Sequence, residues 1–469
     1  MSQYAPSVPA SKALDSEAAP LLARKRTKSA PPAPFVKTDR REILTLVCCI
    51  IFATSLGTVL FNDSLESSTQ RQTIEPVVGI FLVLPYTYMS RRSPHHRAMA
   101  LYMAMGSVFV ERAARAVLYW YSIDSGSGIA ESLSEFTPII HIVGGGPQVV
   151  TAMAYALLMD VYPAAERAGV FLLVGAVTIL SGLVGSPLAT TIRGSTSDAN
   201  GLHYAVLIGV MLQIIAFGLA ACPSTYFSHD KSLNCQDTPW WELRLDDVRE
   251  SSLLSQNARF TMKSAFLAGI GTRGLQTVSQ YGSERFWRGE VVLSREMAYS
   301  SVMSIAALSI LVPVVKTFLT KRMSSVGRDR TITKASAWSL AVGSFIMALA
   351  STSYGLFLFG MGIAAAGSGY HTTIFALGAS LVPASDMGMM CALLLMAQSF
   401  GGIVAAPLVS LTLGRGMELG GVWSGLPFMF ATAALSGAAC LIGFGVRVTA
   451  GENGSDGLDD AEKRQAWTV

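Results

Sequence analysis

Apolar runs close to 20 residues long recur along the chain, and short polar segments separate them. A helix that rises 1.5 Å per residue needs about 20 residues to cross ~30 Å of hydrocarbon. Because backbone polar groups cannot stay unpaired in lipid, these runs are predicted to be helices rather than open strands. We therefore predict an all-α polytopic membrane protein with twelve transmembrane helices. Their predicted ranges are Ile43–Phe61, Pro76–Met89, Ala98–Tyr121, Thr137–Met159, Ala168–Ile192, Leu202–Cys222, Ser264–Tyr281, Val292–Leu319, Ala335–Ala350, Tyr354–Val382, Met387–Leu413 and Val422–Val446.

Two stretches that lie 220 positions apart repeat each other. Pro163 corresponds to Pro383, and Gly182-Leu-Val-Gly-Ser-Pro187-Leu188 aligns without gaps on Gly402-Ile-Val-Ala-Ala-Pro407-Leu408. Such parallel repeats are typical of transporters built from two similar bundles with a site between them. The alternative is chance, because these residue types are common in membrane helices. We predict two six-helix pseudo-repeat bundles.

The polar segments set the predicted domain limits. Residues 1–41 are predicted to be a disordered cytoplasmic tail, because they combine Pro, Ser, Ala and Lys/Arg without helical periodicity. The two bundles are predicted at residues 42–222 and 264–446. The longest internal polar segment, 223–263, is predicted to be a cytoplasmic linker, and 447–469 a second cytoplasmic tail.

Lys and Arg are distributed unequally between the two sides of the predicted membrane. With both termini in the cytoplasm, the inner short segments carry seventeen of these residues and the outer loops six. This bias predicts a cytoplasmic location for both termini. The plasma membrane is the default location. Glu17-Ala-Ala-Pro-Leu21-Leu22 resembles an acidic dileucine sorting signal, which makes the vacuolar membrane the alternative.

Composition and missing motifs exclude several classes. Only 14% of residues are charged and 51% are apolar, whereas soluble domains average about 25% charged residues. The lysine-bearing phosphate loop and the common hydrolase motifs do not occur in the sequence. We therefore expect no enzyme activity, no cofactor, no bound metal, no nucleotide and no nucleic acid. The expected partners are the lipid bilayer, a small-molecule substrate and, as a hypothesis, protons.

The seventh predicted span carries a charge within the membrane. Arg273, Gln276 and Gln280 follow one another at i, i+3 and i+7, so they are predicted to share one helical face. A charge at this depth is expensive unless it is paired or wet. The stripe is therefore predicted to line a water-filled cavity that binds an anionic or hydrogen-bonding solute. The alternative is an arginine that pairs with a helix end for structural reasons.

Glu111, Arg112 and Arg115 form a second charged group in the third predicted span. Glu111 and Arg115 are one turn apart and could neutralise each other. A carboxylate of this kind could also load and release a proton, which makes the pair a candidate for proton coupling. In the alternative interpretation, the span ends near Val110 and the group lies in an amphipathic extension.

The remaining polar candidates lie in the fourth and tenth predicted spans. His141, Gln148, Tyr370 and His371 are candidate substrate-binding residues, although a lone histidine is more often a packing residue. Glycines cluster in both spans, as in Gly144-Gly-Gly-Pro147, and either bend the helices or allow tight packing.

Asp160 and Arg167 flank the loop between the fourth and fifth spans, where Pro163 ends a helix. The two charges could pair, so the loop is a candidate gating element. The second repeat has Ser380 and Met387 at the corresponding positions.

Several motifs together resemble fungal transporters of the major facilitator superfamily, over about residues 84–446. The resemblance implies two six-helix bundles, alternating access, and a cavity lined mainly by helices 1, 4, 7 and 10. That arrangement counts against Glu111, whose helix is usually peripheral. The cavity residues that it favours are His141, Gln148, Arg273, Gln276, Gln280 and His371. The motifs are Gly144-Gly-Gly-Pro147, Asp160-x-x-Pro163-x-x-x-Arg167, Gln280-Tyr281-x-Ser283-x-Arg285-Phe286, Asp329 with Lys334-Ala-Ser336, and Trp423-x-Gly425-Leu426-Pro427-Phe428.

The loop between the second and third spans departs from that family. An acidic residue is usual where this chain has Arg91, and a glycine is usual where it has Pro94. We predict a secondary active transporter that moves a small organic solute by alternating access, with proton-coupled export as the favoured mechanism. The altered loop supports the alternative, a transport-deficient sensor or scaffold that binds ligand without moving it.

Overall fold

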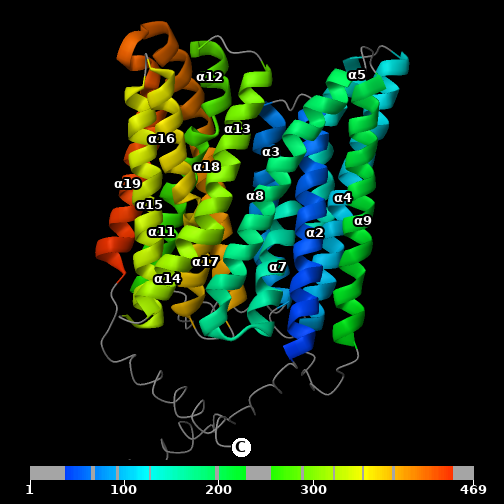
Figure 1. Ribbon diagram of the computed structural model, residues 1–469. Coiled ribbons are helices and arrows are strands. Elements are labelled where there is room, and N and C mark those ends of the chain that lie inside the picture. Colours follow the sequence, from blue (N-terminus) through cyan, green and yellow to red (C-terminus); the bar gives the residue numbers. More distant parts are fainter. Residues whose placement is uncertain are drawn as a thin grey trace, which may run out of the picture.

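The computed structural model describes residues 37–64, 69–90, 94–125, 128–195, 200–228, 255–286, 290–320, 323–350, 353–382 and 386–446. Within this part of the chain every regular element is a helix, and the helices run roughly side by side in two groups (Figure 1). The predicted tails and most of the predicted linker lie outside the described residues. Both ends of that linker are helical.

The amino-terminal bundle contains six spanning segments. The fourth is broken into η1, α6 and α7, and the short helix α5 precedes it at the upper end in Figure 1. The elements are α2 (Lys37–Ser64), α3 (Thr69–Ser90), α4 (Pro94–Ser125), α5 (Gly128–Glu135), η1 (Thr137–Ile140), α6 (His141–Gly144), α7 (Gly146–Val161), α8 (Ala164–Ser195) and α9 (Asn200–Ser228).

The carboxyl-terminal bundle also contains six spanning segments, several of which are interrupted. The elements are α11 (Gln256–Leu275), α12 (Val278–Phe286), α13 (Glu290–Ala306), η3 (Ala307–Leu311), α14 (Val312–Thr320), α15 (Ser325–Leu349), α16 (Tyr354–Ala366), η4 (Gly367–Gly369), α17 (Tyr370–Ser380), α18 (Met387–Leu419), η5 (Gly421–Gly425), α19 (Leu426–Cys440) and η6 (Leu441–Gly445).

The twelve-helix, two-bundle architecture is confirmed. Eight helical segments in the described part of the chain are long and apolar enough to cross a membrane by themselves. The other four spans are α3, α4, α11 and the α16–η4–α17 segment. α3 has Pro76 and Pro85 inside it, and α4 carries Glu111 and three arginines. α11 carries Arg273, and a 3₁₀ turn interrupts the α16–η4–α17 segment. Their composition is costly in lipid and is tolerated because neighbouring helices surround it.

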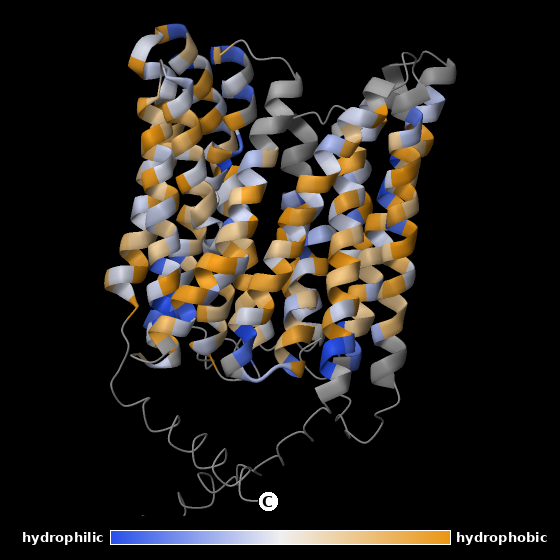
Figure 2. Cartoon of the chain, viewed as in Figure 1, coloured by the Kyte–Doolittle hydropathy of each residue, from blue (hydrophilic) through white to orange (hydrophobic). Residues whose placement is uncertain are grey.

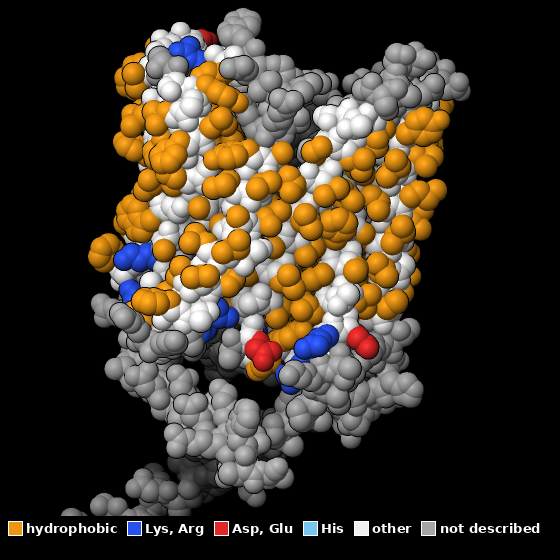
Figure 3. Space-filling view, in the orientation of Figure 1, with side chains coloured by type: hydrophobic (Ala, Val, Ile, Leu, Met, Phe, Trp, Pro, Cys, Tyr) orange, Lys and Arg blue, Asp and Glu red, His pale blue; other side chains and the backbone are white. Residues whose placement is uncertain are grey.

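On the face shown in Figure 3, apolar side chains cover the surface between the two ends of the molecule, and charged side chains lie near the ends. The ribbon coloured by hydropathy shows the same hydrophobic band (Figure 2). Phe81 and Leu411 are 75% and 64% exposed, which is costly in water and favourable in lipid. Inside each bundle, small residues bring helices together. A side chain at Gly343 would collide with the backbone of Ala364, and one at Gly425 with that of Ala348.

Glycines interrupt the fourth and tenth spans at corresponding positions. Gly145 and Gly146 have φ angles of 86° and 65°, which residues with a side chain rarely adopt. In the second half, η4 (Gly367–Gly369) breaks the tenth span at the equivalent place. The predicted glycine-dependent bending is therefore present in the fourth span. Interrupted helices at matching positions of two halves are typical of transporter binding sites.

Candidate transport cavity

A pocket of about 220 Å³ lies between the bundles, and we call it the polar pocket after the several polar side chains in its wall. Only α3 contributes from the amino-terminal side, through Pro76; the other described lining residues come from α11 and its following turn, α17 and α18. They are Gly269, Thr272, Arg273, Gln276, His371, Gln398, Ser399, Gly402, Ile403 and Ala406. Amide, hydroxyl, imidazole and guanidinium groups therefore converge on one small space inside an apolar protein.

Arg273 lies in the last turn of α11 and is partly exposed to the pocket. Its Nη1 donates a hydrogen bond to Oε1 of Gln276 at 2.8 Å, so these two members of the predicted stripe do lie together. Gln280 is placed elsewhere. The helix ends at Leu275, and α12 begins at Val278. Nε2 of Gln280 donates to Oε1 of Glu284 at 3.0 Å within α12. The prediction of one continuous polar face is therefore wrong beyond Gln276, because the helix breaks there.

The wall of the pocket depends on close approach between α11 and α18. A side chain at Gly269 would collide with the backbone carbonyl of Gln398, and one at Gly401 with the carbonyl of Phe266. These glycines let the two helices touch, and the touching backbones place Gln398 and Ser399 beside Arg273. Gln398 and Ser399 were missed in the sequence. The only available signal was a polar pair within the apolar run 387–413.

His371 and Tyr370 are neighbours in the chain but face different surroundings. His371 lines the polar pocket. Tyr370 is fully buried inside the carboxyl-terminal bundle, where its hydroxyl lies 2.8 Å from Oγ of Ser264. Ser264 in turn donates to the carbonyl oxygen of Ala438 at 3.0 Å. The structure thus gives Tyr370 a packing position, not the predicted substrate-binding position.

His141 and Gln148 lie in the amino-terminal bundle and do not line this pocket. His141 is 1% exposed and packs below Gly146, where an added side chain would come within 2.8 Å of its ring. Gln148 fills the space left by Gly79 on α3. In the conformation described here, both residues serve contacts between helices of one bundle.

The two bundles meet below the pocket, toward the end that holds Lys37 and Gly445 (Figure 1). Tyr155 of α7 stacks on Phe375 of α17 with ring centroids 5.0 Å apart. Nη1 of Arg167 on α8 lies 3.0 Å from Sδ of Met387 on α18. These last two residues occupy equivalent positions in the two repeats. We call Tyr155, Arg167, Phe375 and Met387 the lower closure.

Asp160 and Arg167 were predicted to pair with each other, but each side chain has another partner. Asp160 forms its ion pair with Arg97 of α4, and Nε of Arg167 donates to the carbonyl oxygen of Tyr162 at 2.9 Å. Arg97 is 7% exposed and is a further polar residue that the sequence did not single out. Arg97 comes shortly after the altered loop in the chain. Its ion pair with Asp160 joins the start of α4 to the end of α7. Arg91 and Arg92 lie outside the described residues.

Glu111 and its two arginines form a compact cluster inside the amino-terminal bundle. All three are at most 4% exposed. Oε1 of Glu111 accepts from Oγ1 of Thr137 at 3.2 Å and lies 3.9 Å from Nη1 of Arg115; its Oε2 lies 3.3 Å from Nε of Arg112. Both guanidinium groups lie over the ring of Phe61, at 5.3 and 4.8 Å. The predicted Glu111–Arg115 pairing is confirmed. The helix continues without a break to Ser125, and the cluster is buried within the bundle.

Comparison with known proteins places this geometry in context. No family model matches the chain. The chain is 23% identical over 386 residues to the MFS efflux pump atnC of Emericella nidulans, which covers 78% of this chain and 72% of the relative. It is 25% identical over 311 residues to the efflux pump ustT of Aspergillus flavus, covering 61% of this chain and 60% of that pump.

Solved structures with the same fold include a bacterial homologue of the iron transporter ferroportin in an outward-facing state. It has a TM-score of 0.65 at 13% identity and covers 85% of this chain and 98% of that one. The major facilitator transporter FucP in the outward conformation has a TM-score of 0.61 at 12% identity and covers 86% and 99%. Sequence and fold agree: the chain is similar to fungal efflux pumps of the major facilitator superfamily, and it has the fold of solved transporters of that superfamily.

Proposed function

We propose that the chain is a secondary active exporter that moves a small organic solute by alternating access. The observation that carries the proposal is a pocket between two bundles that are joined below it by the Tyr155–Phe375 stack and the Arg167–Met387 contact. Arg273 lies 17 residues after the start of α11, or roughly 25 Å along the helix. Tyr155 lies six residues before the end of α7, near the lower end. The pocket and the closure are therefore at different depths, as alternating access requires.

The chemistry of the pocket favours an anionic solute, or one rich in hydrogen-bond acceptors. Arg273 brings a fixed positive charge, and Gln276, Gln398, Thr272 and Ser399 bring polar groups. The volume of about 220 Å³ lies below the ~300–1,000 Å³ usual for drug-sized ligands, so the proposed solute is small.

Direction and orientation follow from the relatives and from charge. Both curated relatives are named as efflux pumps, which favours export. The end of the molecule that holds Lys37 and Gly445 also carries several arginines. Because short cytoplasmic loops are enriched in Lys and Arg, this excess favours a cytoplasmic position for that end. The proposed location is the plasma membrane, with the vacuolar membrane as the alternative. In this orientation the lower closure seals the cytoplasmic side.

A proton gradient is the proposed energy source, and His371 is the better proposed carrier than Glu111. His371 lines the pocket, whereas Glu111 lies inside the amino-terminal bundle and does not line it. Glu111 already accepts a hydrogen bond from Thr137 and lies beside two guanidinium groups. These contacts suit a structural role.

Metabolite profiling of a deletion strain, inside and outside the cells, would identify the solute. Flux of the labelled solute would then be measured in proteoliposomes with and without an imposed pH gradient. The proposal expects gradient-driven flux that Arg273→Gln abolishes and Arg415→Gln leaves intact. Arg415 is the matched control because its side chain is 75% exposed and pairs with Glu418. Binding without flux in the wild type would contradict the proposal and support a sensor or scaffold.

A further inference from the structure

Phe444 is the most exposed large apolar side chain among the described residues, at 84%. It lies in η6, the π-helical turn that ends the last span near the lower end of the molecule. Figure 3 shows basic side chains beside apolar ones at the lower left edge, where Figure 1 places the end of α19. A phenyl ring this exposed on a membrane-spanning segment contacts lipid rather than water.

Glycines on both sides of Phe444 let two neighbouring helices cover the turn. A side chain at Gly445 would collide with the ring of Phe260 on α11. On the other side, a Cβ added at Gly443 would lie 3.2 Å from Cε of Lys334 on α15. The backbone of the turn is thus covered by residues of both helices, whereas the ring of Phe444 stays uncovered.

Three basic residues of these two helices lie around the turn, and we call them the basic cluster. Nζ of Lys263 on α11 lies 5.6 Å from the ring centre of Phe260. On α15, Lys334 crosses over Gly443, and Arg330 lies one helical turn earlier. Lys263 and Lys334 are exposed, and Arg330 is partly buried. Cations therefore lie on both sides of an exposed aromatic ring.

The basic cluster keeps a net positive charge. None of the ion pairs between described residues includes Lys263, Arg330 or Lys334. Nε and Nη2 of Arg330 donate to the carbonyl oxygens of Ile442 and Gly443 at 3.2 and 2.5 Å. A helix end carries only a partial negative charge, so these bonds do not neutralise the guanidinium group.

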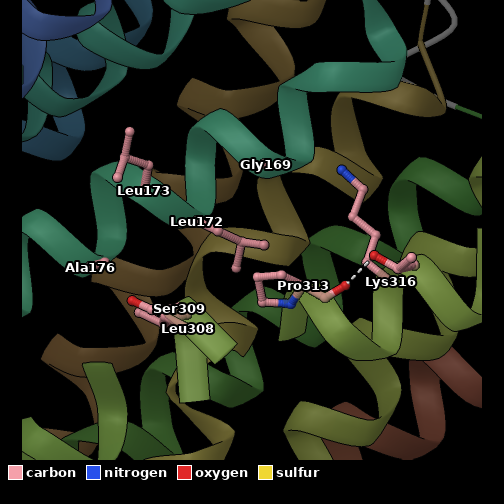
Figure 4. Close-up of a pocket in the computed structure, with 9 residues that line it drawn as sticks. Gly169, Leu172, Leu173, Ala176, Leu308, Ser309, Pro313 and Lys316 are labelled. Carbon is pink, nitrogen blue, oxygen red and sulfur yellow. Dashed lines mark hydrogen bonds between the residues drawn. The ribbon is translucent and has the colours of Figure 1, made fainter. Parts of the chain in front are cut away.

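Lys316, near the same end, has different surroundings. It lines a crevice of about 690 Å³ between α8 and the η3–α14 segment (Figure 4). The carboxylates of Asp329 and Glu166 lie near it, together with the guanidinium group of Arg328. Its charge is therefore balanced within the protein, and Lys316 provides a matched control for the basic cluster.

We propose that Phe444 and the basic cluster bind an anionic phospholipid of the leaflet at the lower end. Its phosphate accepts hydrogen bonds from the ammonium groups of Lys263 and Lys334, and the ring of Phe444 lies among its acyl chains. Long lysine side chains suit this position, because their stems cover apolar surface while their ammonium groups reach the headgroups. The charge of the cluster complements the lipid phosphate, and the exposed ring complements the acyl chains.

The experiment measures lipid binding to the full chain purified in detergent, by native mass spectrometry and by thermal unfolding. The probes are phosphatidylglycerol and phosphatidylcholine with identical acyl chains. One cation near an anionic headgroup changes affinity by roughly fivefold. Wild-type protein should therefore prefer phosphatidylglycerol, Lys263→Gln and Lys334→Gln should each reduce the preference roughly fivefold, and the double variant should lose it. Phe444→Ala should weaken binding of both lipids.

Lys316→Gln is the control and should keep the wild-type preference. Unfolding in phosphatidylcholine alone verifies that each variant is folded. Equal binding of the two lipids by wild-type protein would overturn the proposal. So would an undiminished preference in the double variant, undiminished binding of both lipids by Phe444→Ala, or equal protection by inorganic phosphate, which lacks acyl chains.

The acidic segment 452–462 of this chain is the alternative occupant of the basic cluster, because it carries five carboxylates and no Lys or Arg. A variant in which these five residues are replaced by Asn or Gln separates the two occupants. The proposal expects the same lipid preference as in wild-type protein. A preference that appears only in this variant would assign the cluster to the acidic segment and overturn the proposal.

Discussion

Two groups of arginines lie within the membrane-spanning part of this protein, and their surroundings differ. In the amino-terminal bundle, Arg112 and Arg115 are almost fully buried against the carboxylate of Glu111 and the ring of Phe61. In the carboxyl-terminal bundle, Arg273 lies at a helix break and lines a pocket together with neutral polar groups. A charge within a span is therefore a candidate for a binding site only when it faces open space.

The largest effect is expected from breaking the buried cluster. Glu111→Ala removes the carboxylate that two buried guanidinium groups share, and the loss of one partner of a buried ion pair costs about 3–5 kcal/mol. Thermal unfolding of the purified variant should show a severe loss of stability. Glu418→Ala is the control, because its pair with Arg415 is exposed and should matter little. Equal stability of Glu111→Ala and wild type would contradict the conclusion that this cluster is buried away from water and stabilises the fold.

Arg273→Gln should have the opposite effect, a loss of transport with little loss of stability. Its side chain contacts an open pocket, so stability should change little, whereas flux of an anionic solute should fall roughly tenfold or more when a charge-assisted hydrogen bond is lost. Flux and thermal unfolding are measured on the same preparation. A large loss of stability together with unchanged flux per folded molecule would mean that Arg273 is a structural arginine like Arg115.

A smaller effect is expected at the lower closure. Phe375→Ala removes the stacking on Tyr155, and an aromatic pair contributes about 0.5–1.5 kcal/mol, equivalent to a two- to tenfold shift between conformations. Cys391 on α18 is fully buried and serves as a native probe. In a background whose other cysteines are replaced, its labelling by a maleimide should accelerate by that factor. Phe359→Ala, at a side chain that is 60% exposed, should leave the labelling rate unchanged.

The smallest effect is expected for Gln280→Ala. Gln280 bonds to Glu284 on α12 and does not line the pocket, although sequence spacing predicted it beside Arg273. Flux should stay within about twofold of wild type, as for surface changes that touch no buried network. A loss as large as that of Arg273→Gln would mean that α11 and α12 form one continuous polar face during transport.

The helices could be predicted because apolar length alone specifies a span. The repeat with its 220-residue offset was visible in the same way, and it includes Arg167 and Met387, which the structure brings into contact. Both observations need only local sequence. The fold class, with two bundles of six helices, follows from them.

The site was harder to predict because it depends on which way each helix faces. Tyr370 and His371 are adjacent, and successive helical residues point about 100° apart, so one is buried in a bundle while the other lines the pocket. Asp160 pairs with Arg97, which lies 63 positions earlier on another helix, and no local spacing indicates that partner. The break after Leu275 has no proline to mark it.

The central claim is that water reaches the space beside Arg273, whereas the interior of the same bundle excludes water. Ser399 lines the pocket, whereas Ser264 is fully buried against Tyr370. Ser399→Cys and Ser264→Cys, each in a background without other cysteines, would be exposed to a membrane-impermeant thiol reagent on intact cells. The account predicts rapid labelling at position 399 and none at 264. Equal labelling at both positions, or labelling at 264 alone, would contradict it.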